Sequence, residues 1–330
     1  MSTQPLYPAY LPTRPDGFQP TTAVPYFEAD EPGCRAKRSN KLSVFKTTRD
    51  TKVENITPRV GSEVRGVQLS QLDEAGLNEV ALLAAERGVL VFRDQDFADV
   101  GFDKQKQIVS HYGPLHKVLS AGVGNLRSLL GPRTTYDLWH VDQTFTPNVP
   151  STTFFWVLEQ PASGGGDTAF TSLTAAYAAL SPAFRRTLHG LRLFHTSASV
   201  GEVARVGTER ALREAVSTTH PLVIKHPVTG EPSLFVNPTI ARRVEGFLPE
   251  ESDALLGFLH NHIRSMDFSC RVRWEKGSVV VWDQRSVAHS AVPDFEEGER
   301  RHMVRIIPYG SKPKPAFPEE HEKARGEEEA

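Results

Sequence analysis

The chain has 330 residues, of which 39% are hydrophobic and 24% are charged, as is usual for a globular protein with a substantial core. Its formal net charge of −2 provides no basic field that would attract nucleic acid. The two cysteines, Cys34 and Cys270, exclude a disulfide scaffold and favour a reducing, cytoplasmic location. The N-terminus lacks the apolar stretch of a signal peptide, and no apolar run is long enough to span a bilayer, so we expect no membrane partner.

The distribution of proline and charge divides the chain into three regions. Residues 1–50 are rich in proline and show little apolar periodicity, which predicts an extended or partly disordered arm with the basic run Arg35–Lys41 in solvent. The tail over 311–330 is proline-rich and then highly charged, which predicts disorder. Residues 51–310 contain no internal repeat and no linker, so we expect one domain there.

The elements of this domain follow one another in short segments. Residues 72–88 have helical apolar spacing, an acidic first turn and a closing glycine, and the next five residues, VLVFR, predict a strand. Ser181 followed by Pro182 marks another helix start. We further predict helices over 101–112, 172–180 and 249–264, strands over 152–158, 222–225, 233–236, 279–282 and 303–307, and a hairpin in HPVTGEPSLFVN. Many short strands with helices before and between them predict a mainly β sandwich or barrel with helical decoration.

The motif WHVDQTF over 139–145 is the strongest chemical signal. Residues two apart on an extended strand point to the same side, so His140 and Asp142 can bind one metal ion together. A third ligand is available in VVVWDQRSVAHSAV, where His289 follows an apolar strand. Two histidines and one carboxylate form the facial triad of non-haem iron(II) oxygenases, which leaves positions open for a bidentate co-substrate and O₂.

An arginine-rich segment, RRHMVRII, follows the second histidine at a hairpin-length distance. Its alternation places Arg301, Met303 and Arg305 on one face. Guanidinium donates two parallel hydrogen bonds to a carboxylate, so an arginine beside the metal is suited to the far carboxylate of 2-oxoglutarate.

Three motifs resemble the taurine/sulfonate dioxygenase family, especially its fungal members. They are WHVDQTF, SGGGDTAFTSLTAAYAALSP and VVVWDQRSVAHSAVPDFEEGERRHMVR, and they occur in the order of that family. The resemblance covers about residues 50–310 and implies a double-stranded β-helix, or jelly roll, as a single catalytic domain. It also implies that the iron centre carries the chemistry without a separate protein acid or base. The residues to which it assigns roles are His140, Asp142 and His289 for iron, Thr168 and Arg301 for 2-oxoglutarate, and Arg305 for the co-substrate or the anion of the substrate.

Some positions depart from the sulfonate-specific pattern. The segment GPLHKV retains His116 but has Val118 where those relatives place a second histidine that contacts the sulfonate. Tyr136 stands where some relatives place an asparagine near 2-oxoglutarate, and Trp139 either packs or contacts the substrate. His116 either lines the substrate pocket or caps the helix that ends near Gly113.

The sequence thus predicts an Fe(II)- and 2-oxoglutarate-dependent dioxygenase that oxidises an unactivated C–H bond of a small organic substrate with O₂, releasing succinate and CO₂. A role in secondary metabolism fits these departures. The alternative within the family is cleavage of a sulfonate or sulfate ester, as in taurine oxidation. The alternative from another class is a catalytically silent jelly roll that binds a small anion. A homodimer or higher homo-oligomer stays open.

Overall fold

The computed structural model describes residues 25–39, 51–116, 138–198, 215–296 and 298–319. The helices in these ranges are α1 (Pro32–Ser39), α3 (Glu74–Arg87), α4 (Phe102–Ser110), α6 (Leu173–Ala179), α7 (Pro182–Thr187) and α9 (Pro249–His262), with 3-10 turns η2 (Leu69–Gln71) and η3 (Met266–Phe268). The strands are β1 (Lys52–Asn55), β2 (Ser62–Arg65), β3 (Val89–Phe92), β4 (Thr152–Glu159), β5 (Thr168–Ser172), β6 (Arg192–Thr196), β7 (Ser217–Pro221), β8 (Val223–Lys225), β9 (Pro232–Leu234), β10 (Ala241–Val244), β11 (Ser269–Val272), β12 (Val279–Asp283), β13 (Val287–Ala291), β14 (His302–Ile306) and β15 (Lys314–Pro315).

The helix starts that the sequence predicts are confirmed by their capping contacts. The side chain of Asp73 accepts a hydrogen bond from the N–H of Gly76 at the start of α3, and Gly88 ends that helix with a φ of 77°. Ser172 caps α6, and Ser181 caps α7 just before a proline. Each cap satisfies a backbone donor that the first turn of a helix leaves unpaired.

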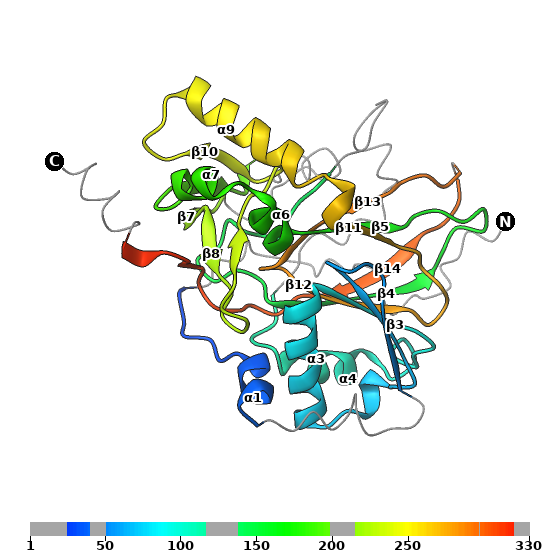
Figure 1. The fold of residues 1–330 in the computed structure, drawn as a ribbon. Coiled ribbons are helices and arrows are strands. Elements are labelled where there is room, and N and C mark those ends of the chain that lie inside the picture. Colours follow the sequence, from blue (N-terminus) through cyan, green and yellow to red (C-terminus); the bar gives the residue numbers. More distant parts are fainter. Residues whose placement is uncertain (1–24, 40–50, 117–137, 199–214, 297, 320–330) are drawn as a thin grey trace, which may run out of the picture.

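A six-stranded sheet, ordered β1-β2-β3-β12-β4-β14, forms the centre of the molecule. Its strand β12 is buried on both faces, because Val279 and Val281 pack toward α3 and α4 while Val280 and Trp282 pack on the opposite side. Figure 1 shows α3 and α4 against one face of this sheet and β5, β11 and β13 beyond the other. Burial on both faces explains the continuous apolar run in this strand.

The three-stranded sheet β11-β5-β13 is the second layer of the core. Both partners run antiparallel to β5. Phe170 of β5 shares one buried cluster with Trp282 of the central sheet, and their ring centroids lie 5.5 Å apart. Short antiparallel strands with helices outside them confirm the prediction of a mainly β fold with helical decoration.

Within the described residues, part of the region expected to be an extended or partly disordered arm, and part of the tail expected to be disordered, form regular elements. Residues 32–39 form α1, which packs on α3 through Ala36, Leu82 and Ala85. Arg35 is half-buried and pairs with Asp30, so it is not a solvated charge. At the other end β15 pairs with β8, and residues 316 and 317 pack on the core. None of the described helices has the length and apolar character needed to cross a membrane.

Candidate metal centre

His140, Asp142 and His289 come together, as the sequence predicts, in a cluster in which His140 is half-buried and the other two are buried. One potential ligand atom from each lies within 4.8 Å of those of the other two. The Nε2 atom of His140 is 3.6 Å from Oδ1 of Asp142, and Nε2 of His289 is 4.0 Å from Oδ2. The two imidazole centroids are 4.2 Å apart. Each histidine therefore presents one ring nitrogen, and Asp142 one carboxylate oxygen, to a common point.

The local backbone differs from the extended strand that we expected for His140 and Asp142. His140 forms an isolated antiparallel bridge with His289, and their backbone groups exchange two hydrogen bonds of 2.9 Å. Asp142 lies in the turn that follows, next to Gln143 with a φ of 50°. The two histidines are thus brought together by backbone pairing, whereas the position of the carboxylate depends on the turn.

The electrostatic environment favours the protonation states that a metal needs. Burial opposes ionisation of Asp142, but the nearby charge of Arg305, together with the proximity of His289 and His140, outweighs it and holds the pKa of Asp142 well below its ordinary range. Arg305 donates from Nη1 to both carboxylate oxygens, at 2.8 and 2.9 Å. Burial, reinforced by the proximity of His140, holds the pKa of His289 well below its ordinary range. The cluster therefore contains an ionised carboxylate and a neutral imidazole.

The orientation of His140 leaves its Nε2 atom available. Its Nδ1–H donates to the carbonyl oxygen of Leu138 at 2.6 Å, which places the ring lone pair on the other nitrogen. Metal-ligating histidines are commonly oriented in this way. Two imidazoles and a carboxylate suit Fe(II) with open coordination positions, so the residues present fit the metal that the sequence implies.

The residues expected to bind 2-oxoglutarate lie at the start of β5. Thr168 is buried at the first position of that strand, and its hydroxyl oxygen accepts a 3.2 Å hydrogen bond from the indole N–H of Trp274. Arg301 comes just before β14 and donates from Nε to the carbonyl oxygen of Gly166 at 2.9 Å. A Cβ atom on Gly166 would lie 2.9 Å from both Cδ and Nε of Arg301, so only glycine allows this approach. Burial lowers the pKa of Arg301 to about 10, against the charge of Asp167.

The two arginines contact different parts of the site. Arg305, on β14, reaches Asp142, whereas Arg301, just before that strand, reaches the glycine turn before β5. The register of β14 against β4 shifts between His302 and Met303, where the extra residue lies in β4, so the shift leaves the alternation along residues 301–305 in place.

Of the four residues that the sequence predicts to contact the substrate, the structure describes two. His116 is buried, donates its backbone N–H to Ile307 and packs its ring against Tyr309 at a centroid distance of 4.6 Å. Trp139 is half-buried beside the metal cluster and packs on the core that includes Val141. The remaining two, Val118 and Tyr136, lie outside the described residues.

Sequence reasoning missed Gln284, which makes direct contact with the candidate metal ligand Asp142. Its side-chain N–H donates to Oδ2 of Asp142 at 2.6 Å, and its side-chain oxygen accepts from the backbone N–H of the same residue at 3.1 Å. Gln284 lies inside the motif VVVWDQRSVAHSAV, two residues after a tryptophan, but glutamine by itself carries no sign of such a role.

Comparisons with known proteins agree with this geometry. Residues 52–307 match the family described as taurine catabolism dioxygenase TauD, TfdA family. The chain is 44% identical to the alpha-ketoglutarate-dependent dioxygenase cnsP of Penicillium expansum, over 96% of this chain and 90% of that protein. It is 36% identical to an alpha-ketoglutarate-dependent sulfonate dioxygenase of Saccharomyces cerevisiae, over 93% and 78% of the two chains.

A solved structure confirms the jelly-roll prediction. The crystal structure of a taurine dioxygenase from Burkholderia xenovorans superposes with a TM-score of 0.67 at 28% identity, covering 81% of this chain and 91% of that one. The chain therefore belongs to the TauD, TfdA family of taurine catabolism dioxygenases and is an enzyme of the dioxygenase class.

Proposed function

We propose that this dioxygenase binds Fe(II) through His140, Asp142 and His289 and uses 2-oxoglutarate as its co-substrate. The observation that supports this most directly is the convergence of three potential ligand atoms within 4.8 Å of one another, from one half-buried and two buried side chains. The relatives described as alpha-ketoglutarate-dependent dioxygenases support the co-substrate. Catalysis is assigned to a domain over residues 51–310, in line with the family match over 52–307. A cytoplasmic location and an oligomeric assembly stay predictions.

Two side chains would hold the carboxylate of 2-oxoglutarate that faces away from the metal. Arg301 keeps its terminal guanidinium nitrogens for this carboxylate, since the contact with Gly166 uses only Nε. Thr168 accepts a hydrogen bond from Trp274, and an indole N–H can only donate, so the hydroxyl hydrogen of Thr168 is left to donate to the carboxylate. Trp274 thereby sets the direction of the Thr168 donor.

When bound, Fe(II) and 2-oxoglutarate supply the oxidising chemistry, in which O₂ converts the oxo acid to succinate and CO₂ and a substrate C–H bond is oxidised. The protein contributes geometry and exclusion of water. Phe170 and Trp282 pack against the ring of His289 at centroid distances of 6.0 and 5.1 Å and shield it. No separate protein acid or base is assigned to the reaction.

Metal binding tests the assignment without requiring the substrate. Anaerobic titration of metal-free protein with Fe(II) should give one site per chain in the wild type, and His140→Ala, Asp142→Ala and His289→Ala should each lose it, because a site with open positions needs all three ligands. The control is His260→Ala, on α9, which removes a half-buried histidine outside the triad and should leave metal binding intact. Full iron stoichiometry in any triad variant would contradict the assignment.

For the substrate, we propose a specialised metabolite and expect taurine to be a poor one. Arg305 is engaged by Asp142, and Val118 replaces the histidine that sulfonate-specific relatives use. A sulfonate facing valine would lose a charge-assisted hydrogen bond worth about 1.5–3 kcal/mol. The yeast sulfonate dioxygenase favours the second candidate, cleavage of a sulfonate or sulfate ester.

Sulfite release and succinate formation separate these candidates. Taurine, longer alkyl sulfonates, sulfate esters and neutral metabolites are supplied with Fe(II), 2-oxoglutarate and O₂, and the rates are compared. Efficient sulfite release from taurine would restore the sulfonate assignment. Turnover of neutral compounds alone would limit Arg305 to the metal and co-substrate side of the site.

A further inference from the structure

Both the N–H₂ group and the oxygen of the Gln284 side-chain amide form hydrogen bonds at the candidate metal centre. It lies in the turn between β12 and β13 and is fully buried. Besides its two contacts with Asp142, its side-chain N–H₂ donates to the hydroxyl of Thr153 at 3.1 Å. Its backbone N–H donates to the carbonyl of Ser151 at 3.2 Å. These contacts allow only one orientation of the amide, with the N–H₂ group toward the carboxylate of Asp142.

The reciprocal pair with Asp142 matters because the backbone does not hold this ligand as it holds the histidines. His140 and His289 are paired across a bridge, but Asp142 is in a turn with a left-handed residue after it. Gln284 contacts Asp142 twice, at its backbone N–H and at its Oδ2 atom, so it sets both the position of the turn and the rotation of the carboxylate. A hydrogen-bond partner of a ligating carboxylate typically changes metal affinity by about 10–100-fold.

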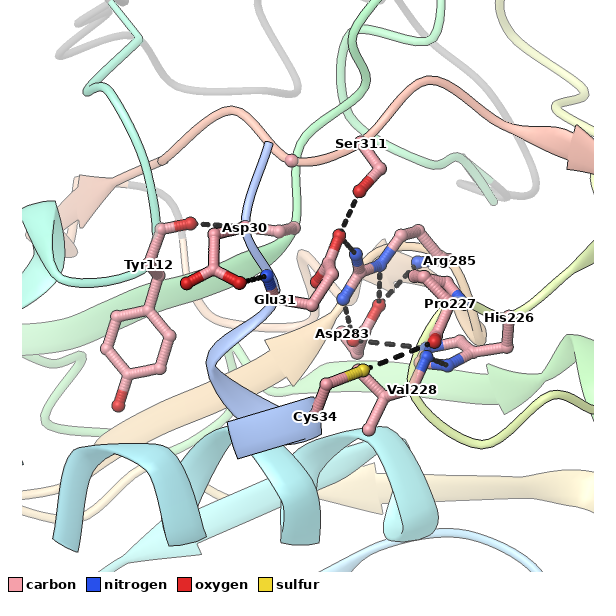
Figure 2. A network of polar contacts seen from close by, with 12 residues as sticks. Asp30, Glu31, Cys34, Tyr112, His226, Pro227, Val228, Asp283, Arg285 and Ser311 are labelled. Atoms are coloured by element: carbon pink, nitrogen blue, oxygen red, sulfur yellow. Dashed lines mark hydrogen bonds and ion pairs between the residues drawn. The ribbon is translucent and has the colours of Figure 1, made fainter. Parts of the chain in front are cut away.

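A buried charge cluster holds the turn that carries Gln284 (Figure 2). Its sequence neighbours Asp283 and Arg285 pair with each other through two side-chain hydrogen bonds, of 2.9 and 2.7 Å. Arg285 also donates to Glu31 at 2.7 Å, and Glu31 contacts Ser311. Glu31 comes from the segment before α1, so that segment contacts Arg285, the residue that follows Gln284 in the chain.

The fourth member of the cluster is His226, on the β8–β9 hairpin. Its Nδ1 atom accepts from the backbone N–H groups of Val228 and Thr229, at 3.2 and 3.3 Å. Its Nε2 atom therefore carries the proton and lies 3.2 Å from Oδ2 of Asp283. The turn is thus held from the N-terminal segment and from the hairpin at once, and an uncompensated charge here would be costly.

We propose that Gln284 is a positioning residue for the metal ligand Asp142, and that the cluster of Glu31, Asp283, Arg285 and His226 keeps Gln284 in place. This inference rests on the proposed function, because it concerns the ligand that Fe(II) would use. It assigns to the N-terminal segment a part in metal binding, in addition to its packing on α3.

The test compares two glutamines that make equivalent contacts. Gln95 is buried after β3 and also makes three side-chain hydrogen bonds, to Val67, Arg93 and Leu69, but it does not contact the triad. Gln284→Met and Gln95→Met each keep side-chain length and remove the amide. Metal affinity is measured by anaerobic titration of metal-free protein with Co(II), followed by its visible spectrum, and thermal unfolding is recorded in parallel.

We expect Gln284→Met to weaken Co(II) binding by about 10–100-fold. Gln95→Met should lower the melting temperature without changing metal affinity. Unchanged Co(II) affinity in Gln284→Met, or an equal loss in both variants, would overturn the positioning role. If His140→Ala bound Co(II) as tightly as the wild type, the triad itself, and this inference with it, would be wrong.

The charge cluster has its own pair of variants. Glu31→Gln removes the charge that faces Arg285 and keeps a hydrogen-bonding side chain, so it should lower Co(II) affinity in the same direction as Gln284→Met. Glu28→Gln removes an exposed carboxylate three residues earlier and serves as the control. Wild-type Co(II) affinity in Glu31→Gln would overturn the part assigned to the cluster.

Discussion

Gly166→Ala should weaken the binding of 2-oxoglutarate although Gly166 contributes no side chain to the site. Its φ is 71°, so any L-residue there costs about 1–2 kcal/mol. The added methyl group would also lie 2.9 Å from Cδ and Nε of Arg301, which would force the guanidinium away from its contact with the Gly166 carbonyl. Loss of the charge-assisted bond from Arg301 to the co-substrate is worth about 1.5–3 kcal/mol, or roughly 10–100-fold in affinity.

Gly164→Ala separates the effect on Arg301 from backbone strain. Gly164 has a φ of 86° in the same turn, but a Cβ atom there meets nothing within 4 Å. Anaerobic titration of the Fe(II) protein with 2-oxoglutarate, followed by its visible charge-transfer band, gives the dissociation constant for each variant. Both alanines should lower stability by a similar amount, and only Gly166→Ala should raise the dissociation constant. Equal constants in the two variants would refute the reasoning.

The remaining predictions concern the same site and the core behind it. Arg301→Ala should raise the KM for 2-oxoglutarate by roughly 10–100-fold and leave that for the substrate nearly unchanged, with partial recovery in Arg301→Lys, because an ammonium group lacks the paired donors; an unchanged KM for 2-oxoglutarate would transfer the role to Arg305. Trp274→Phe should raise the same KM severalfold at nearly constant kcat, since the Thr168 hydroxyl loses the donor that orients it, and an unaltered KM would show that this donor is unimportant. Burial lowers the pKa of His220 to about 4, so its contribution to stability is complete above the unfolded-state pKa of 6.5 and is lost as the pH falls toward 4. The loss is about 2 kcal/mol between pH 7.5 and 5, so urea unfolding of metal-free protein should depend less on pH in His220→Gln than in the wild type, and parallel profiles would contradict the assignment.

The candidate metal site could be predicted from the sequence because each of its side chains lies in a short motif whose residue types are specific. His140 and Asp142 are two residues apart, and a second histidine lies far along the chain. Two imidazoles and one carboxylate are the ligand set of a non-haem iron site. The helices α3, α6 and α7 could be predicted equally well, because their capping residues and apolar spacing are local signals in the sequence.

Other elements left no such signal. Strand β1, with the sequence KVEN, is exposed at every position, so it shows no alternation that could predict it. Helix α1, with the sequence PGCRAKRS, follows a proline-rich segment and has few apolar residues, and it packs through Ala36 on α3. Packing from elsewhere in the chain decides these elements, and local propensity is too weak to indicate them.

The supports of the site were decided by the tertiary structure alone. Gln284 and Asp142 are 142 residues apart, Arg301 and Gly166 are 135 apart, and Arg285 and Glu31 are 254 apart. A hydrogen bond between such distant residues leaves no periodicity and no fixed spacing in the sequence, because folding of the sheets, and not the local chain, sets the distance between the partners. Residue types and their order along the chain indicate which side chains can bind the metal and the co-substrate. The packing of β5, β12 and β13 with the N-terminal segment decided which neighbours orient them.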